Sequence, residues 1–333
     1  MKTLILSGGG YNGIMHVGCA KCLEELGCLG AMNTVIGTSA GSIIALMLAM
    51  NYTTAEITRL VHKHLVLADD AADDALDPCE VFEICETYGI SNGEKLEGLV
   101  KEILCGKNVD ASITFMELGK RFGKNLVVCG ANLTRRRSEY FCIDTTPDMR
   151  VALAVRISCS VPILFTPVAH EGCLYVDGGI YAHFPHEYVH ENLKGGVNEK
   201  DTIGVNILVA QCEITSLSSY IVELLNSVMD RALQTEKIRD LSFVCNLKQS
   251  TSLSFDLLQL GVTQEKVDGL IEEGYVTMKA FMAERERRAR SLFGATMQLG
   301  REVVNAATAI VDIGSAVRCD EDNGGEGGHD GVG

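Results

Sequence analysis

Two glycine-rich turns in the first fifty residues constrain the fold of this chain more than any other feature. The apolar run TLIL ends in the loop GGGYNG (8–13), and apolar residues then recur at helical intervals. The apolar residues 34–36 end in the loop GTSAG (37–41), which leads into the apolar segment 42–50. Each unit has the pattern of a strand, a tight turn and a buried helix. Two such units in succession predict a parallel sheet with helices packed on it.

The same alternation continues further along the chain. Helical periodicity occurs at 53–67, 91–104, 115–122 and 148–158, and strand-like segments occur at 125–134, 138–144, 173–179 and 202–210. We therefore expect an α/β fold, with three layers (α/β/α) and a mainly parallel central sheet, over residues 1–211.

A different pattern follows this core. Helical periodicity at 217–233, 265–273 and 276–317 predicts a mainly helical C-terminal extension over residues 212–318. The segment 319–333 is polar, acidic and glycine-rich, so we expect it to be disordered.

Composition and charge exclude several classes of function. The 44 Asp and Glu residues exceed the 29 Lys and Arg residues and give a net charge of −15, which argues against nucleic acid as a partner. The apolar run after Lys2 is too short for a signal peptide, so we expect a cytoplasmic protein with free thiols. We find no uncharged segment that is long enough to span a membrane.

Two groups of potential metal ligands are explained more simply without a metal. Cys19 and Cys22 form a lone C-x-x-C on one face of an expected helix, where core packing accounts for both. The five aspartates from Asp69 to Asp77 lack the spaced glycine and terminal glutamate of an EF-hand loop, and they fit a solvated acidic linker. We expect neither a metal nor another cofactor.

The loop from Gly37 to Gly41 has the G-x-S-x-G pattern of a nucleophile elbow. It lies between a strand and a helix, as an elbow requires, and its two glycines allow neighbouring backbone to pass close by. The hydroxyl of Ser39 would then be exposed in front of a helix N-terminus, which favours developing negative charge. Ser39 is therefore the candidate nucleophile.

The glycine loop at 8–13 admits several interpretations. A dinucleotide site would need an acidic residue at the end of the next strand, which instead runs into the Ser39 turn. A P-loop would need a Lys-Ser or Lys-Thr pair after the glycines, and the chain has none there. Adjacent glycines can also present backbone N–H groups to an oxyanion, which is the interpretation we favour over a purely structural turn.

A third motif, Asp177-Gly178-Gly179, follows the strand-like residues 174–176. By itself it would be an ordinary turn. An aspartate at the end of a core strand, however, lies where open parallel sheets gather their active-site residues. Asp177 is therefore the candidate base for Ser39.

In combination the chain resembles the patatin-like phospholipases, which carry G-G-G-x-[RK]-G, G-x-S-x-G and D-G-[GA] in this order. The resemblance continues in TFMELGKRFGKNLVVCGANLT, PDMRVALAVRISCSVPILFTPV and LYVDGGIYAHFP, and it covers about residues 1–190. Asn12 departs from the pattern, because the family usually has Arg or Lys at this position.

The resemblance implies a patatin-like α/β/α fold and a lipid acyl hydrolase that acts on phospholipids or neutral lipids. Ser39 would form the acyl-enzyme and Asp177 would accept its proton, without a histidine. The oxyanion hole would lie at Gly8, Gly9 and Gly10, with the N–H groups of Gly9 and Gly10 as donors and Gly8 shaping the loop. The other motif residues are Gly13, Gly37, Gly41, Gly178 and Gly179.

Two alternatives remain open at this point. One is a Ser-His-Asp esterase that uses His183, His186 or His190, which follow Asp177 closely. The other is a lipid-binding protein without catalysis on the same fold.

Access to lipid requires transient contact with a membrane surface. The segment 276–293, with an arginine cluster at 285–290, is either an interfacial helix or an ordinary packed helix. Its apolar members are Met278, Phe281, Met282, Leu292 and Phe293. Similarly, one helix face after Met50 either lines an acyl pocket or packs in the core. That face holds Ile57, Leu60, Val61, His64 and Leu65.

Overall fold

The computed structural model describes residues 2–65, 86–188, 199–208, 213–215, 217–232, 241–248 and 263–321. The aspartate cluster from Asp69 to Asp77, His190 and residues 322–333 lie outside the described residues. The chain divides into two compact units, Met1–Ala280 and Phe281–Gly333.

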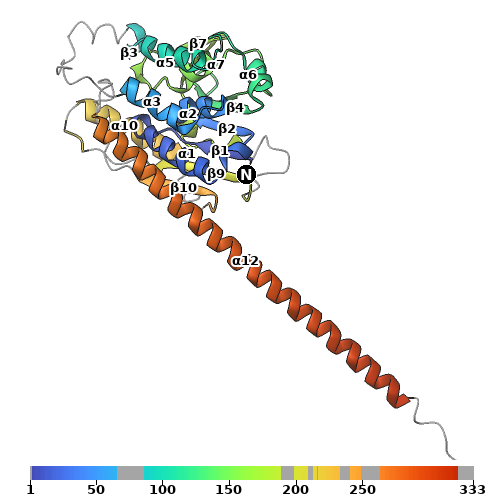
Figure 1. Ribbon diagram of the computed structural model, residues 1–333. Coiled ribbons are helices and arrows are strands. Elements are labelled where there is room, and N and C mark those ends of the chain that lie inside the picture. Colours follow the sequence, from blue (N-terminus) through green and yellow to red (C-terminus); the bar gives the residue numbers. More distant parts are fainter. Residues whose placement is uncertain are drawn as a thin grey trace, which may run out of the picture. The chain divides into compact units, whose positions relative to one another are not determined.

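An eight-stranded sheet forms the centre of the first unit, with helices around it (Figure 1). The strand order is β10-β9-β1-β2-β4-β8-β7, and β5 also pairs with β4. The pairs among β10, β9, β1, β2 and β4 are parallel, whereas β4–β5, β4–β8 and β8–β7 are antiparallel. This mainly parallel sheet confirms the predicted α/β fold class.

The strands are short, and those in the centre are almost wholly buried. Those of the large sheet are β1 (Thr3–Leu6), β2 (Thr34–Thr38), β4 (Asn125–Asn132), β5 (Arg137–Phe141), β7 (Val168–His170), β8 (Cys173–Asp177), β9 (Thr202–Leu208) and β10 (Val244–Lys248). Two further strands, β3 (Gly89–Ser91) and β6 (Ile163–Phe165), form a separate parallel pair.

Helices alternate with these strands. They are α1 (Met15–Glu25), α2 (Ala40–Ala49), α3 (Thr54–Leu65), α5 (Glu94–Cys105), α6 (Phe115–Phe122), α7 (Val151–Ser158), α8 (Gly179–Ala182), α10 (Leu217–Ala232) and α12 (Gln264–Glu321), with 3-10 turns η1 (Gly10–Ile14) and η2 (Leu29–Ala31). Within the described ranges no helix has the length and apolar character to cross a bilayer.

The sheet extends beyond the expected end of the α/β core near residue 211. Strand β10, in the region expected to be mainly helical, pairs in parallel with β9 over Val244 to Lys248. Its five residues, VCNLK, include two polar side chains and show no clear strand alternation, so local periodicity did not predict it. The strand conformation of β10 is stabilised by backbone hydrogen bonds to β9, a long-range contact that a local sequence pattern does not show.

Helix α12 is continuous where two helices were expected, on either side of Gly274. A side chain at Gly274 would lie 2.1 Å from the Met15 carbonyl oxygen, and one at Gly18 would lie 1.8 Å from that of Ile271. Gly274 therefore permits a close crossing of α1 and α12 and does not interrupt the helix. The same helix continues to Glu321, into the segment expected to be disordered from residue 319.

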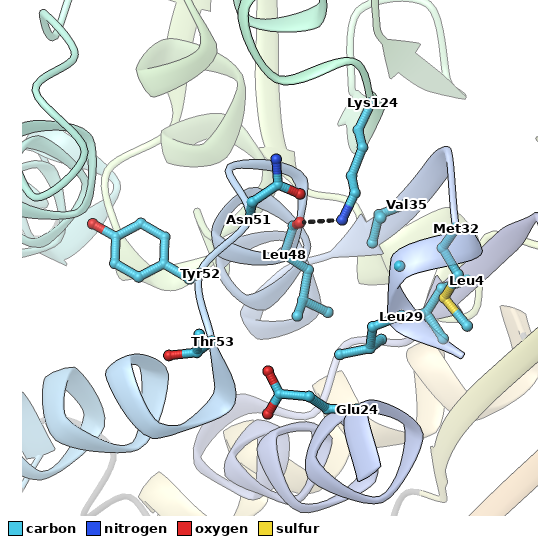
Figure 2. Close-up of a pocket in the computed structure, with 11 residues that line it drawn as sticks. Leu4, Glu24, Leu29, Met32, Val35, Leu48, Asn51, Tyr52, Thr53 and Lys124 are labelled. Carbon is cyan, nitrogen blue, oxygen red and sulfur yellow. Dashed lines mark hydrogen bonds between the residues drawn. The ribbon is translucent and has the colours of Figure 1, made fainter. Parts of the chain in front are cut away.

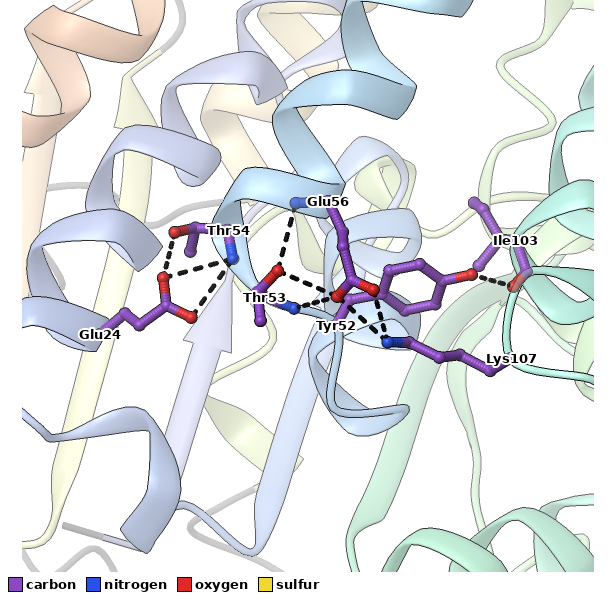
Figure 3. A network of polar contacts seen from close by, with 7 residues as sticks. All are labelled: Glu24, Tyr52, Thr53, Thr54, Glu56, Ile103 and Lys107. Carbon is purple, nitrogen blue, oxygen red and sulfur yellow. Dashed lines mark hydrogen bonds and ion pairs between the residues drawn. The ribbon is translucent and has the colours of Figure 1, made fainter.

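A polar network fixes the start of α3 (Figure 3). The Thr53 N–H donates to Glu56 Oε2 at 2.7 Å, and the Glu56 N–H donates to Thr53 Oγ1 at 3.2 Å, which together form a capping box. Lys107 Nζ donates to Glu56 Oε1 at 2.8 Å and lies over the ring of Tyr52. Lys107 and the Thr53 N–H hold the pKa of Glu56 at about 2, well below its usual value.

We expect Glu56→Gln to lower the free energy of unfolding by about 1 kcal/mol at pH 7, because a neutral amide weakens the charge-assisted hydrogen bonds from Lys107 Nζ and the Thr53 N–H. Because the native pKa of Glu56 is depressed, its contribution is present above about pH 4.5 and is lost as the pH falls toward 2. Urea unfolding at pH 7 and at pH 2.5 measures this. An equal difference between variant and wild type at both pH values would contradict the assignment.

Candidate active site

Ser39 lies on a strained turn between β2 and α2. Its backbone has φ 52° and ψ −129°, a left-handed conformation that is costly for a residue other than glycine. A side chain at Gly41 would lie 2.4 Å from the Ser7 carbonyl oxygen, and one at Gly37 would lie 2.4 Å from that of Gly41. Only glycine at both positions allows so sharp a turn, as the G-x-S-x-G pattern predicts.

Buried serines fix the backbone of Ser39. The Ser39 N–H donates to Ser158 Oγ at 2.9 Å, and the Ser158 hydroxyl donates to the Cys129 carbonyl at 2.6 Å. On the other side, the Ser42 hydroxyl donates to the Ser39 carbonyl at 2.6 Å. Local sequence patterns predict neither Ser158 nor Ser42. Ser158 lies in one of the segments that carry the family resemblance, but no local pattern marks it.

The sheet register brings Asp177 toward Ser39. Thr38 is paired with Cys129, and the next residue of β4, Gly130, is paired with Asp177 on β8. A side chain at Gly178 would lie 2.4 Å from the Cys129 carbonyl oxygen, so the turn after Asp177 packs directly on β4. The G-x-S-x-G turn after β2 and the Asp177-Gly178-Gly179 turn after β8 therefore lie on either side of strand β4.

Asp177 is buried, with 1% of its surface exposed. Oδ1 accepts a hydrogen bond from the Gly179 N–H at 2.7 Å, and the Asp177 N–H donates to the Ser160 carbonyl at 2.8 Å. Burial raises the pKa of Asp177 to about 7, although the Ser39 hydroxyl and the Gly179 N–H act in the opposite direction.

The Ser39 hydroxyl is close enough to lower the pKa of Asp177, but Asp177 Oδ2 makes no hydrogen bond to any described residue. Catalytic hydrogen bonds are often long in free enzymes and shorten when substrate binds. The arrangement is therefore suitable for proton transfer from Ser39 to Asp177 after a small movement.

The first glycine loop packs against Ser39. A side chain at Gly8 would lie 3.6 Å from Ser39 Cβ. The Gly8 N–H donates to the His183 carbonyl at 2.9 Å and is therefore not available to an oxyanion. No acceptor among the described residues is found for the N–H of Gly9 or of Gly10. These two remain the candidate donors, and Gly8 has a spacing role.

The loop contains no charged side chain. Asn12, at the position where the resemblance leads one to expect Arg or Lys, is 2% exposed, and its Oδ1 has no partner among the described residues. His16 is buried nearby in sequence, and its Nε2–H donates to the Ser7 carbonyl at 2.9 Å. Burial lowers the pKa of His16 to about 4, so it is neutral at pH 7.

The geometry does not favour a triad that uses His183 or His186. A triad histidine needs one ring nitrogen for the serine and the other for the aspartate. The Nε2–H of His183 instead donates to the Ile207 carbonyl at 3.1 Å. His186 directs Nδ1 to the Phe184 carbonyl at 3.2 Å.

A pocket of about 200 Å³ lies at the opposite, amino ends of β1 and β2 (Figure 2). Leu4, Val35 and Leu48 form part of its apolar wall, and Lys124 Nζ donates to the Leu48 carbonyl at 3.1 Å. Ser39 and Asp177 do not line it. In the part of the chain that the structure describes, no group of three His, Cys, Asp or Glu side chains is arranged to hold a metal.

The helix face after Met50, which either lines an acyl pocket or packs in the core, lies on α3. Ile57 and Val61 are buried on α3, which fits the core-packing interpretation at these two positions. His64 is only half-buried, and its Nε2 lies 3.0 Å from a Glu102 oxygen. The side chain of Leu65 lies outside the described residues.

Within the segment 276–293, Met278 is fully buried, which supports the interpretation as a packed helix at this position. Further along, Arg287, Arg288 and Arg290 form ion pairs with Glu284 or Glu286. The side chains of Leu292 and Phe293 lie outside the described residues.

Comparison with known proteins agrees with this geometry. Residues 4–190 match the family described as patatin-like phospholipase. A protein of Acanthamoeba polyphaga mimivirus, named only as uncharacterized, is 30% identical over 76% of this chain and 90% of its own length. "Probable lipid hydrolase 463L" of Invertebrate iridescent virus 6 is 32% identical over 55% of this chain and 61% of its own length.

Among solved structures, VipD from Legionella pneumophila superposes with a TM-score of 0.51 at 18% identity, over 85% of this chain and 67% of that protein. At this identity the likeness supports the fold alone.

We expect Asp177→Asn to stabilise the protein at neutral pH. The native pKa is raised, so wild-type stability falls as the pH rises from about 4 to about 7, where the buried carboxyl must ionise. An amide avoids this cost, and the variant should gain roughly 1–3 kcal/mol at pH 8 and little at pH 4. Thermal unfolding at both pH values measures the gain, and lower stability of the variant at pH 8 would contradict the burial argument.

Proposed function

Because the chain belongs to the patatin-like phospholipase family, we propose that it hydrolyses acyl esters of lipids with Ser39 as nucleophile and Asp177 as base. The proposal is carried by one observation: three motifs that are far apart in the sequence meet at Ser39. Gly8 packs against the Ser39 side chain, and Asp177 is close enough for the Ser39 hydroxyl to lower its pKa. The name of the related lipid hydrolase supports the same class of substrate.

In the first step, Ser39 Oγ attacks the carbonyl carbon of the ester while Asp177 accepts the hydroxyl proton. The oxyanion accepts hydrogen bonds from the N–H groups of Gly9 and Gly10, with the N-terminus of α2 adding positive potential. The tetrahedral intermediate then collapses, and the alcohol leaves with the proton that Asp177 returns. An acyl group remains on Ser39.

In the second step, Asp177 accepts a proton from water, which attacks the acyl-Ser39 carbonyl. As this second intermediate collapses, the bond to Ser39 Oγ breaks and Asp177 returns the proton to Ser39, which releases the carboxylic acid and restores the hydroxyl. An ordinary carboxylate is a weak base for both steps. Burial brings the pKa of Asp177 to about 7, close to the pH at which it would act.

We expect Ser39→Ala and Asp177→Asn each to lower kcat/KM for a short p-nitrophenyl ester by about 10³-fold, because each removes a group that reacts. Wild-type kcat/KM should increase with pH and reach half of its maximum near pH 7, since only ionised Asp177 can accept the proton.

His186→Ala serves as the control in the same assay, with circular dichroism to confirm folding, and it should keep near-normal turnover. Loss of activity in His186→Ala with near-normal activity in Asp177→Asn would favour the triad. Absence of turnover in the folded wild type would favour a lipid-binding protein without catalysis.

We propose that the protein reaches its substrate through the outer face of α10. Tyr220, Leu224 and Val228 are spaced by four residues on one side of this helix and are 50%, 52% and 41% exposed. On the inner side, Met229 Sδ lies 3.3 Å from where a side chain at Gly179 would start. An exposed apolar stripe on a helix whose other face packs on the turn after Asp177 suits transient contact with a lipid surface.

Leu224→Asp should lower hydrolysis of phosphatidylcholine vesicles about tenfold and leave turnover of a soluble ester unchanged. The reason is that contact of α10 with the membrane would move the aspartate charge from water into the lipid surface, which is costly. Val276→Asp is the matched control, since Val276 is 54% exposed on α12 and belongs to the segment 276–293, the alternative candidate for membrane contact. A larger loss in Val276→Asp than in Leu224→Asp would assign the contact to α12 instead.

A further inference from the structure

The geometry points to Ser158 as the residue that positions Ser39 for attack. This inference rests on the proposed function, because it concerns the same nucleophile. Ser158 ends helix α7 and is fully buried, and it belongs to none of the three motifs. Its hydroxyl connects the backbone of Ser39 to strand β4.

Both hydrogen bonds of this hydroxyl have a fixed direction. The Cys129 carbonyl can only accept, so the Ser158 hydroxyl proton points to it at 2.6 Å. A lone pair then faces the Ser39 N–H at 2.9 Å. Because the donor and the acceptor are both held by backbone atoms, the hydroxyl has a single orientation that satisfies them.

The same short segment also holds the candidate base. The carbonyl of Ser160 accepts from the Asp177 N–H at 2.8 Å. Residues 158 and 160 therefore contact the backbone of both Ser39 and Asp177, through a side chain in one case and a main-chain carbonyl in the other. The contact with Asp177 uses only the main chain of residue 160, so the Ser160 side chain takes no part in it.

Ser39 has particular need of such a contact. Its φ of 52° is strained for a serine, and a strained turn persists only where surrounding contacts oppose its relaxation. Loss of the Ser158 hydroxyl would leave the Ser39 N–H without its acceptor and allow the turn to shift. A misplacement of about 1 Å can cost roughly 100-fold in rate.

Ser160 provides a matched control. Its side chain is also fully buried and also makes two hydrogen bonds, both to Arg156. The Ser160 hydroxyl touches neither Ser39 nor Asp177, and Ser160→Ala keeps the carbonyl that binds Asp177. The two alanine variants therefore lose similar contacts in the core but differ in their connection to the nucleophile.

The test measures turnover of a short p-nitrophenyl ester and the rate of Ser39 labelling by a fluorophosphonate, together with thermal stability. We expect Ser158→Ala to lower kcat and the labelling rate by about 10- to 100-fold with little change in KM. Ser158→Thr, which keeps the hydroxyl, should restore much of both rates. Ser160→Ala should keep kcat within about threefold of wild type even where its stability falls.

A pH profile adds a readout that a purely structural role would not move. The Ser39 hydroxyl lowers the pKa of Asp177, so a displaced Ser39 should shift the midpoint of kcat/KM to higher pH in Ser158→Ala and not in Ser160→Ala. If Ser158→Ala does not fold, Ser158→Cys keeps the size and weakens the hydrogen bond, and it should show the same changes to a smaller degree.

Equal kcat and labelling rates in wild type and folded Ser158→Ala would overturn the inference, as would an equal kinetic loss in Ser160→Ala. These outcomes leave the proposed function intact, because wild type remains active and Ser39→Ala remains inactive. A wild type without turnover or labelling would instead overturn the proposed function, and the role of Ser158 with it.

Discussion

The candidate active site depends on backbone segments that approach each other too closely for any side chain. Gly41 lies against the Ser7 carbonyl and Gly178 lies against the Cys129 carbonyl, each at a distance where a Cβ atom would clash. These contacts lie at the carboxyl ends of the parallel strands β1 and β2, where open sheets of this class assemble their sites. The antiparallel strand β8 brings Asp177 to the same place, because Asp177 is paired with Gly130 of β4. The strained backbone of Ser39 is a consequence, because the chain must turn within the space that the glycines leave.

The same close packing explains the electrostatics of the site. Asp177 is buried and has no cationic partner among the described residues, so its pKa is raised and its ionised form is costly. This destabilises the folded protein at neutral pH but provides a carboxylate that can accept a proton near pH 7. The neutral Asn12 and His16 add no positive charge that would reverse the effect. The proposed catalytic role and the stability of the fold therefore make opposite demands on Asp177.

Local sequence patterns predicted much of this arrangement. The capping residue Thr114 and the αL glycine Gly123 delimit α6 at the expected residues, and the strand-turn-helix units at Gly8 and Ser39 appear as predicted. Strand β10 and the continuity of α12 were missed, because they depend on pairing with β9 and on packing against α1. Ser158 was missed for a similar reason: its partners Ser39 and Cys129 are distant in sequence, and one serine in a helix carries no periodic signal.

The central claim is that Ser39 carries the acyl group during turnover. The most direct test quenches the reaction with a p-nitrophenyl ester in acid during steady state and locates any acyl group by mass spectrometry of the peptides. We expect an adduct of the acyl mass on the peptide that contains Ser39, which disappears when the substrate is exhausted. Continued turnover with no adduct, or with an adduct on a different residue, would contradict it.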